Sequence, residues 1–263
     1  MSTLLDFYDP FLYELNVGHA PRVGDVYCKE LSSLPPGSRV LDLGCGTGDI
    51  LVPLAVEGAE VIGVDSSPRM LEHLARRLAT LPDEVAARVR LVERTVPALP
   101  AMDRADAAVL ANDFVSHLLS DTELDELFRN VRRVLKPDAI LLLDVERFDV
   151  AFLGSLTGSG GGLTRTHGFF DYPDGRLLRV DEQSAYDEAT GIITSTFGYQ
   201  ILDGQGMVES TTYRTLRMCP RRIREITVAL QLAGFDITEV RADAFPAELD
   251  HILISARARA EHD

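Results

Sequence analysis

A chain of 263 residues with a net charge of −15 can bury one sizeable core, or a core with a small appended unit. The acidic balance is unfavourable for contact with a phosphate backbone, so no nucleic-acid partner is expected. No apolar run approaches the roughly 18 residues of a membrane span, and the N-terminus lacks the regions of a signal peptide, so we expect a cytoplasmic protein with no membrane partner. Cys28, Cys45 and Cys219 have no paired spacing, so neither a disulfide framework nor a metal site is expected.

The N-terminal part of the chain is expected to be a helical segment of residues 1–37. It contains the aromatic-rich run FYDPFLYEL, with Tyr8 and Tyr13, and a helix predicted over residues 22–34. A Pro-Pro-Gly sequence follows that helix and is expected to end it, because proline lacks an N–H and disfavours helical backbone before it.

The segment VLDLGCGTGDI, which begins at Val40, carries the most information. A strand is predicted over residues 39–43, then come Gly44, Gly46 and Gly48, and then a helix over about 49–57. Glycine has no Cβ, so the turn can adopt positive φ and a ligand can lie directly on its backbone. A strand that runs into a glycine turn and a helix is typical of a nucleotide-binding βαβ unit.

A second strand is predicted over residues 60–65 and ends in Asp65. This acid comes about 20 residues after the first glycine, the spacing at which a carboxylate accepts hydrogen bonds from a ribose. The next helix is expected to begin at Pro68, with Ser67 as its N-cap. Asp65 could itself cap this helix, but Ser66 and Ser67 already supply that role.

The following elements alternate between strands and helices. Strands are predicted over residues 89–93, 105–111 and 139–145. A helix begins at Ser120, with Glu123 as the second member of a capping box, and a Lys-Pro pair at residues 136–137 is expected to end it. The strand AILLLDV is apolar almost throughout, as expected of a strand that is covered on both faces. This pattern predicts an α/β fold: a Rossmann-like, mostly parallel sheet with helices on both faces.

Beyond residue 150 the pattern changes. A stretch rich in glycine, serine and threonine over residues 154–162 is interpreted as a flexible connection. Turn signals then separate β-rich stretches near 176–187, 192–202 and 207–218, and the segment 163–172 could add a fourth strand. After Pro220 the α/β pattern resumes, with a helix that Gly234 ends and strands near 235–241 and 250–257. An antiparallel β insert is therefore predicted after the fifth strand.

The glycine spacing distinguishes between cofactors. Dinucleotide sites use G-x-G-x-x-G to hold a pyrophosphate, whereas this chain has G-x-G-x-G with Asp42 two residues before the first glycine. An acid there would repel a pyrophosphate but suits a ligand with an ammonium group. Through VLDLGCGTGDI and VIGVDSSPRML, the chain resembles the class I S-adenosylmethionine-dependent methyltransferases over most of residues 38–148. The implied cofactor is S-adenosyl-L-methionine, which has a ribose and an amino-acid tail but no phosphate.

The order of the segments narrows this resemblance. An N-terminal helical cap (1–37), a cofactor domain (38–149 and 220–263) and an antiparallel insert (150–219) are similar to the small-molecule N-methyltransferases of the glycine and antibiotic amino-sugar types. The resemblance implies that the insert forms a lid over the acceptor. It also implies a small-molecule acceptor methylated on nitrogen or oxygen, as in secondary metabolism. The exposed strand edges of the insert could pair with another subunit in a homo-oligomer.

The cofactor residues follow from the motif. Asp65 is expected to accept hydrogen bonds from both ribose hydroxyls, and Asp42 to contact the methionine ammonium or cap the amides of the glycine turn. Met70 could lie against the adenine or fill the core, and Cys45 is expected to be a small turn residue rather than a reactive thiol. The residues expected to line the cofactor site are Tyr13, Asp42, Gly44, Cys45, Gly46, Gly48, Asp65, Ser66, Met70, Arg94, Thr95, Val96 and Asn112.

At the adenine end the chain departs from the family pattern, which places an aspartate a few residues before a Leu-Pro pair. Here the pair begins at Leu99 and the expected position holds Thr95. The bond from the adenine amino group would then be accepted by the Thr95 hydroxyl, by a backbone carbonyl or by Glu93.

Candidate catalytic residues lie in ANDFVSHLL, after the fourth strand, and in the N-terminal run. In open α/β sheets the carboxyl ends of the strands face the ligand. Asp113, His117 and Tyr8 are the candidates because each could take a proton from the acceptor. His117 could equally be a structural histidine, and Tyr8 and Tyr13 could be packing aromatics.

Three other functions fit parts of the pattern. An NAD-type oxidoreductase uses a related domain, but the glycine spacing and Asp42 disfavour it. A methyltransferase of macromolecules is disfavoured by the net charge and by the lack of an N-P-P-Y type motif after the fourth strand. A module that binds the cofactor without turnover would keep the same cofactor residues.

Overall fold

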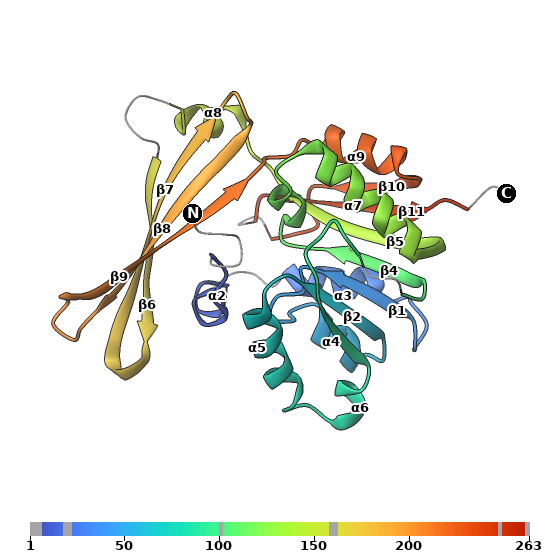
Figure 1. Ribbon diagram of the computed structural model, residues 1–263, viewed down its shortest axis with the longest axis horizontal. Coiled ribbons are helices and arrows are strands. Elements are labelled where there is room, and N and C mark those ends of the chain that lie inside the picture. The colour runs from blue at the N-terminus through green and yellow to red at the C-terminus, as the bar shows by residue number, and fades with distance from the viewer. Residues whose placement is uncertain (1–6, 18–22, 100–101, 158–162, 247–248, 261–263) are drawn as a thin grey trace. The chain divides into compact units, whose positions relative to one another are not determined.

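The computed structural model describes residues 7–17, 23–99, 102–157, 163–246 and 249–260 (Figure 1). The chain divides into two compact units. The larger unit comprises residues 21–147 and 221–263, and the smaller comprises residues 1–20 and 148–220. The expected N-terminal segment 1–37 is therefore divided between the units, since its helix α3 (Val23–Leu31) belongs to the larger one.

The larger unit is built on a seven-stranded sheet in the described part of the chain. Its strands are β1 (Arg39–Leu43), β2 (Glu60–Asp65), β3 (Val89–Glu93), β4 (Ala105–Leu110), β5 (Leu135–Glu146), β10 (Phe235–Arg241) and β11 (His251–Ala258). Their order is β10-β11-β5-β4-β1-β2-β3, and β1 to β5 pair in parallel while β11 is antiparallel to β5 and β10. The strand order reverses between β1 and β4, which is where open α/β sheets bind their ligands.

Helices cover both faces of this sheet (Figure 1). The helical segments are α3, α4 (Leu51–Val56), α5 (Pro68–Leu78), α6 (Asp83–Ala86), the 3₁₀ turn η1 (Phe114–His117), α7 (Asp121–Val134) and α9 (Ile223–Leu232). One core cluster joins the strands to Phe128 of α7 and Leu230 of α9, and the other joins them to Tyr27, Leu54 and Leu74 of α3, α4 and α5. The predicted fold class is thus confirmed. Among the described helices, none is long and apolar enough to cross a membrane.

The segment at residues 135–139 differs from the prediction. Helix α7 ends at Val134, and Lys136 and Pro137 belong to the start of β5 rather than to a loop before a strand at 139. The pairing of β4 with β5 shifts register there, between Ala105 and Ala107. A proline without an N–H is tolerated at such an irregularity because the ladder is already interrupted.

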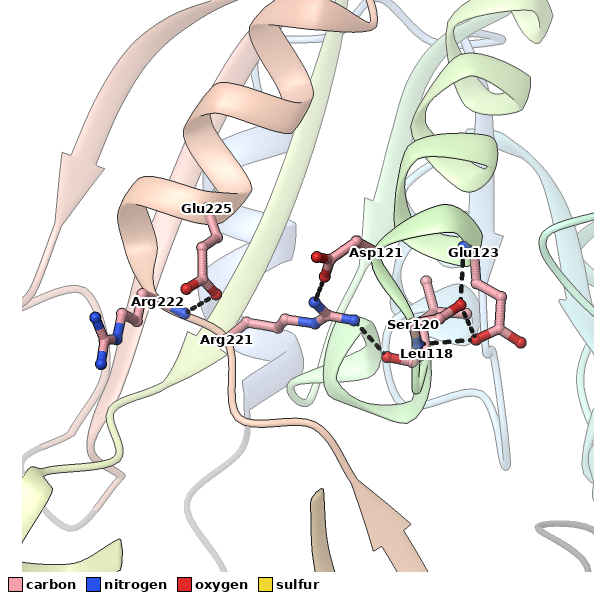
Figure 2. Close-up of polar contacts among 7 residues, drawn as sticks. All are labelled: Leu118, Ser120, Asp121, Glu123, Arg221, Arg222 and Glu225. Atoms are coloured by element: carbon pink, nitrogen blue, oxygen red, sulfur yellow. Dashed lines mark hydrogen bonds and ion pairs between the residues drawn. The ribbon is translucent and has the colours of Figure 1, made fainter. Parts of the chain in front are cut away.

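A buried arginine joins the starts of α7 and α9 in the larger unit (Figure 2). Arg221 donates from Nη2 to the Leu118 carbonyl at 2.7 Å and from Nη1 to the Asp121 carboxylate. Beside it, the predicted capping box is present: Glu123 N lies 3.3 Å from Ser120 Oγ, and Ser120 N lies 3.0 Å from Glu123 Oε2. The first residue after the insert is therefore fixed to the same turn that begins α7.

The smaller unit contains α2 (Pro10–Val17), α8 (Val150–Ser155), the 3₁₀ turn η2 (Pro173–Gly175) and an antiparallel sheet. The sheet consists of β6 (Leu163–Tyr172), β7 (Arg176–Asp187), β8 (Ile192–Leu202) and β9 (Val208–Met218), paired in that order. The expected fourth strand is present as β6. Helix α8 was not predicted; it overlaps the start of the supposed connection, and the Asp149 side chain caps it by accepting from Phe152 N. Residues 158–162 of that connection lie outside the described residues.

Candidate functional site

The glycine turn after β1 uses its three glycines in different ways. All three have positive φ, at 75° for Gly44, 50° for Gly46 and 89° for Gly48. A Cβ on Gly44 would lie 2.4 Å from Phe114 Cδ2, and one on Gly48 would lie 2.5 Å from Leu74 Cδ1. A Cβ on Gly46 would meet nothing closer than 3.9 Å. Packing therefore excludes side chains at the outer two positions, whereas Gly46 presents open backbone that a ligand can approach.

The carboxylate of Asp65 links the turns that follow β1 and β2. Its Oδ2 accepts from Gly46 N at 3.0 Å, and its Oδ1 accepts from Ser67 N at 2.8 Å. Burial raises the pKa of Asp65, while the amides of Ser67, Gly46 and Ser66 partly offset that shift. Ser67 caps α5 as predicted, accepting from Met70 N at 3.3 Å. Asp65 thus holds the glycine turn against the start of α5, and its contact with a ribose stays a prediction.

Asp42 is a buried acid without a matching cation among the described residues. Burial and the charges of Asp65 and Asp49 raise the pKa of Asp42 to about 7. Its Oδ2 has no hydrogen-bond partner within the described parts of the chain. An unpaired buried oxygen of this kind is costly unless a ligand satisfies it. The ammonium end of an amino acid has the charge and the hydrogen-bond donors that this oxygen lacks.

The remaining predicted cofactor residues have simpler surroundings. Cys45 is buried, and burial raises the pKa of its thiol well above the ordinary value, which favours a packing role. Met70 is also buried. After β3, the side chains of Arg94 and Thr95 are exposed, and Val96 packs against the core. Arg94 N donates to the Asp65 carbonyl at 2.9 Å, so this segment lies beside the end of β2.

The turn after β4 is strained and carries two of the predicted residues. Asn112 and Asp113 are non-glycine residues with φ of 60° and 51°, a conformation that persists only where the surroundings enforce it. Burial raises the pKa of Asp113 well above its ordinary value, and the charges of Glu146 and Asp144 add to the shift. Burial lowers the pKa of His117 to about 4, so this imidazole is neutral at pH 7.

Sequence reasoning missed the residue that holds this turn. Asp144 is fully buried near the end of β5 and accepts from Asn112 N and Asp113 N, each at 2.8 Å. It also accepts from Tyr27 Oη, and its Oδ2 lies 2.6 Å from His251 Nδ1. The available signal was a single acid in the otherwise apolar run AILLLDV, since a buried carboxylate is rare unless it has partners.

Tyr8 and Tyr13 belong to the smaller unit. The Tyr8 ring packs edge-on against Phe7, with centroids 5.0 Å apart, and against Tyr13 at 6.0 Å. Both tyrosines are half-buried. Their predicted roles at the cofactor and acceptor stay predictions.

Comparisons with known proteins agree on the kind of domain. Residues 40–138 match the sequence model of a family described as a methyltransferase domain. The YqeM protein of Bacillus subtilis (strain 168), named as a methyltransferase, is 35% identical over 136 residues, which is 51% of this chain and 52% of that protein. The cypemycin N-terminal methyltransferase of a Streptomyces species is 29% identical over 78% of this chain and 75% of its own length. This chain spans about half the length of the first curated relatives that it matches.

Solved structures share the fold along nearly the whole chain. The CcbJ methyltransferase from Streptomyces caelestis has a TM-score of 0.72 and 22% identity, and the match covers 96% of this chain and 100% of that one. CalS10, an amino pentose methyltransferase from Micromonospora echinaspora, has a TM-score of 0.71 and 17% identity, with 95% and 97% covered. At these identities the likeness shows a common fold.

Proposed function

We propose that the protein transfers a methyl group from S-adenosylmethionine to a nitrogen or oxygen of a small molecule, because residues 40–138 match the sequence model of a methyltransferase domain family. The observation that carries this proposal is the pair of acids beside the open glycine turn. Asp65 binds the Gly46 amide, and Asp42 keeps one buried oxygen without a partner among the described residues. A dinucleotide would bring phosphate charge toward both acids, whereas an adenosyl amino acid brings an ammonium group.

Different residues along the carboxyl edge of the sheet bind different parts of the cofactor. Asp65 binds the ribose hydroxyls, Asp42 balances the ammonium, and Gly46 lets the ligand approach the backbone. The segment Arg94–Val96 borders the adenine, and Asn112 lies on the far side of the turn after β1. When bound, S-adenosylmethionine supplies an electrophilic methyl group, so the protein's main tasks are orientation and the exclusion of water.

The acceptor is a small amine or hydroxyl compound. Support comes from Glu146 at the end of β5, whose charge adds to the raised pKa of Asp113 and would favour a basic or proton-donating acceptor. Among the relatives and neighbours are an amino pentose methyltransferase, a sugar N-methyltransferase, an N-terminal methyltransferase and an O-methyltransferase of ubiquinone biosynthesis. Amino sugars, peptides with a free N-terminus and hydroxyl-bearing quinone precursors are therefore the acceptor classes to assay.

Binding of S-adenosylhomocysteine and of NADH, measured by isothermal titration calorimetry, tests the cofactor. The wild-type protein is expected to bind S-adenosylhomocysteine, and Asp65→Ala is expected to weaken that binding at least about 100-fold, because a buried charge-assisted bond is worth a few kcal/mol. Asp103→Ala is the matched control, since Asp103 is 90% exposed and pairs with Arg39 at the start of β1. Binding of NADH without binding of S-adenosylhomocysteine would overturn the proposal. Formation of S-adenosylhomocysteine with the acceptor panel then distinguishes an enzyme from a binding module.

A further inference from the structure

The imidazole of His251 and the carboxylate of Asp144 form a pair at the carboxyl edge of the sheet in the larger unit. Neither residue is among the candidates predicted from the sequence. His251 is the first residue of β11 and pairs in register with Glu146, the last residue of β5. Its Nδ1 lies 2.6 Å from Asp144 Oδ2, the same oxygen that accepts from Asp113 N. One carboxylate therefore joins His251 directly to the strained turn after β4.

The hydrogen bonds of Asp144 fix the tautomer of His251. Its two oxygens receive two backbone amides, the Tyr27 hydroxyl and the imidazole, and these four contacts fill the acceptor positions of a carboxylate. Nδ1 of His251 must then carry a hydrogen, so the neutral ring has its lone pair on Nε2. Among the described residues, Nε2 has no hydrogen-bond partner, and 13% of the side chain is exposed.

The surroundings of His251 favour uptake of a proton. Burial alone would lower the pKa of His251, but the hydrogen bond and charge of Asp144, with the charges of Glu146 and Asp113, raise it above the ordinary value. The neighbouring Asp250 is already paired with Arg147, whose Nε lies 2.7 Å from Asp250 Oδ1. The Phe245 ring packs edge-on against the imidazole, with centroids 5.9 Å apart, and fixes its plane.

We propose that His251 is the residue that removes the acceptor's proton, with Asp144 as the positioning residue that orients its ring. This inference rests on the proposed function. A lone pair on the acceptor nitrogen or oxygen forms the bond to the methyl carbon, and the S–CH₃ bond breaks with its electron pair left on sulfur. The proton of the acceptor atom passes to Nε2 of His251, which later releases it to water. Most of the predicted cofactor residues lie at the ends of β1, β2 and β3, with Asn112 after β4, so the part of the edge formed by β5 and β11 is the side left for the acceptor.

The first test determines which nitrogen of the His251 imidazole carries hydrogen, in the absence of an acceptor. In ¹H–¹⁵N multiple-bond spectra of protein labelled at histidine, His251 is expected to carry hydrogen on Nδ1 and none on Nε2 when neutral. The His251→Asn variant assigns the signal by its loss. A hydrogen on Nε2 in the neutral ring would overturn the inference, because that nitrogen could not accept a proton.

The second test uses turnover with the amino-sugar, peptide and quinone-precursor panel. Asparagine can still donate to Asp144 but cannot accept a proton, so His251→Asn is expected to lower kcat about 100-fold, the usual contribution of a general base. In the wild type, kcat should decrease as the pH is lowered and His251 becomes protonated. The His251→Asn variant should not show this decrease. The matched control His73→Asn, on α5, is expected to keep the wild-type rate and pH profile. An unchanged kcat in His251→Asn would overturn the inference.

Calorimetry tests the role of His251 separately from the proposed methyltransferase function. His251→Asn is expected to bind S-adenosylhomocysteine as the wild type does, because no predicted cofactor contact is changed. Failure of the wild type to bind overturns the proposed function, whereas normal binding with an unchanged kcat in the variant overturns only the role of His251.

Discussion

At the scale of single residues, the ionisation of Asp42 makes a prediction about pH. Burial and the charges of Asp65 and Asp49 raise the pKa of Asp42 to about 7 in the ligand-free protein. Above that pH the carboxylate is charged and attracts an ammonium group; below it the acid is neutral and the attraction is lost. Affinity for S-adenosylhomocysteine is therefore expected to fall about tenfold per pH unit below 7, until the pKa of the bound state is reached. Calorimetric titrations at a series of pH values check this slope.

The control for this prediction is Asp42→Asn, which removes the titration. Its affinity should be weak and nearly independent of pH over the same range. At pH 8 the variant should also unfold at a higher denaturant concentration than the wild type, because it no longer holds an unpaired buried charge. Affinity that rose as the pH fell would contradict the role of Asp42.

A second residue prediction compares two glycines. Gly46 and Gly37 have positive φ, of 50° and 81°, and neither has an atom that would crowd an added Cβ. Alanine should therefore cost about 1–2 kcal/mol of stability at either position, as expected for a left-handed residue. Only Gly46→Ala is expected to weaken S-adenosylhomocysteine binding, because only that backbone lies beside Asp65. Equal affinities for the two variants in calorimetry would show that the ligand does not approach Gly46.

At the scale of elements, the smaller unit ties its N-terminal segment to its sheet through Arg214 on β9. Arg214 Nη1 donates to the Phe7 carbonyl at 3.2 Å, and Nη2 lies 3.5 Å from Asp9 Oδ2. Removing one partner of a shielded ion pair leaves the other charge uncompensated. Arg214→Ala is expected to speed amide exchange across residues 8–17 about tenfold or more, as read by hydrogen–deuterium exchange.

Arg217→Ala is the control for this experiment. Arg217 is exposed on the same strand, three residues further along, so its side chain points to the opposite face of the sheet. It should leave exchange across residues 8–17 unchanged. If both variants exchanged at the wild-type rate, the segment would be held by its apolar contacts, which include Leu12 and Leu15, and not by the arginine.

The regular elements could be predicted because their signals are local. Strands β1, β2, β3 and β7 occupy the predicted residues, and the capping box at Ser120 is present, since periodicity and caps depend on neighbours in the sequence. Helix α8 was missed because it is short and lies beside a glycine-rich stretch, so periodicity could not reveal it. The early start of β5 was missed because its proline is accommodated by an irregularity in pairing that the sequence does not specify.

The candidate site also contains residues that could be predicted from the sequence and residues that could not. Asp42, the glycine turn and Asp65 could be found because their spacing along the chain carries the chemistry. The hydrogen-bonded group around Asp144 could not, because His251 is 107 positions away and Tyr27 is 117 positions away. They meet only through strand order and the register of β11 with β5, both of which are tertiary.

At the scale of the whole molecule, the charge and the fold support the same class of ligand. A net charge of −15 produces a field that repels phosphates and attracts cations, an effect that salt weakens. Within the larger unit, Asp42, Asp65, Asp113 and Glu146 gather acid at one edge of the sheet. Both features favour a phosphate-free ligand with an ammonium group.

The two arginines that flank residues 148–220 determine which contacts hold the ends of this segment. Arg147 is fixed to Asp250 just before the chain leaves the larger unit, and Arg221 is fixed to Leu118 and Asp121 just after it returns. Each end of this segment is thus held by a contact within the larger unit. We therefore expect that a segment of different sequence or length can replace residues 148–220 without changing the fold of the larger unit.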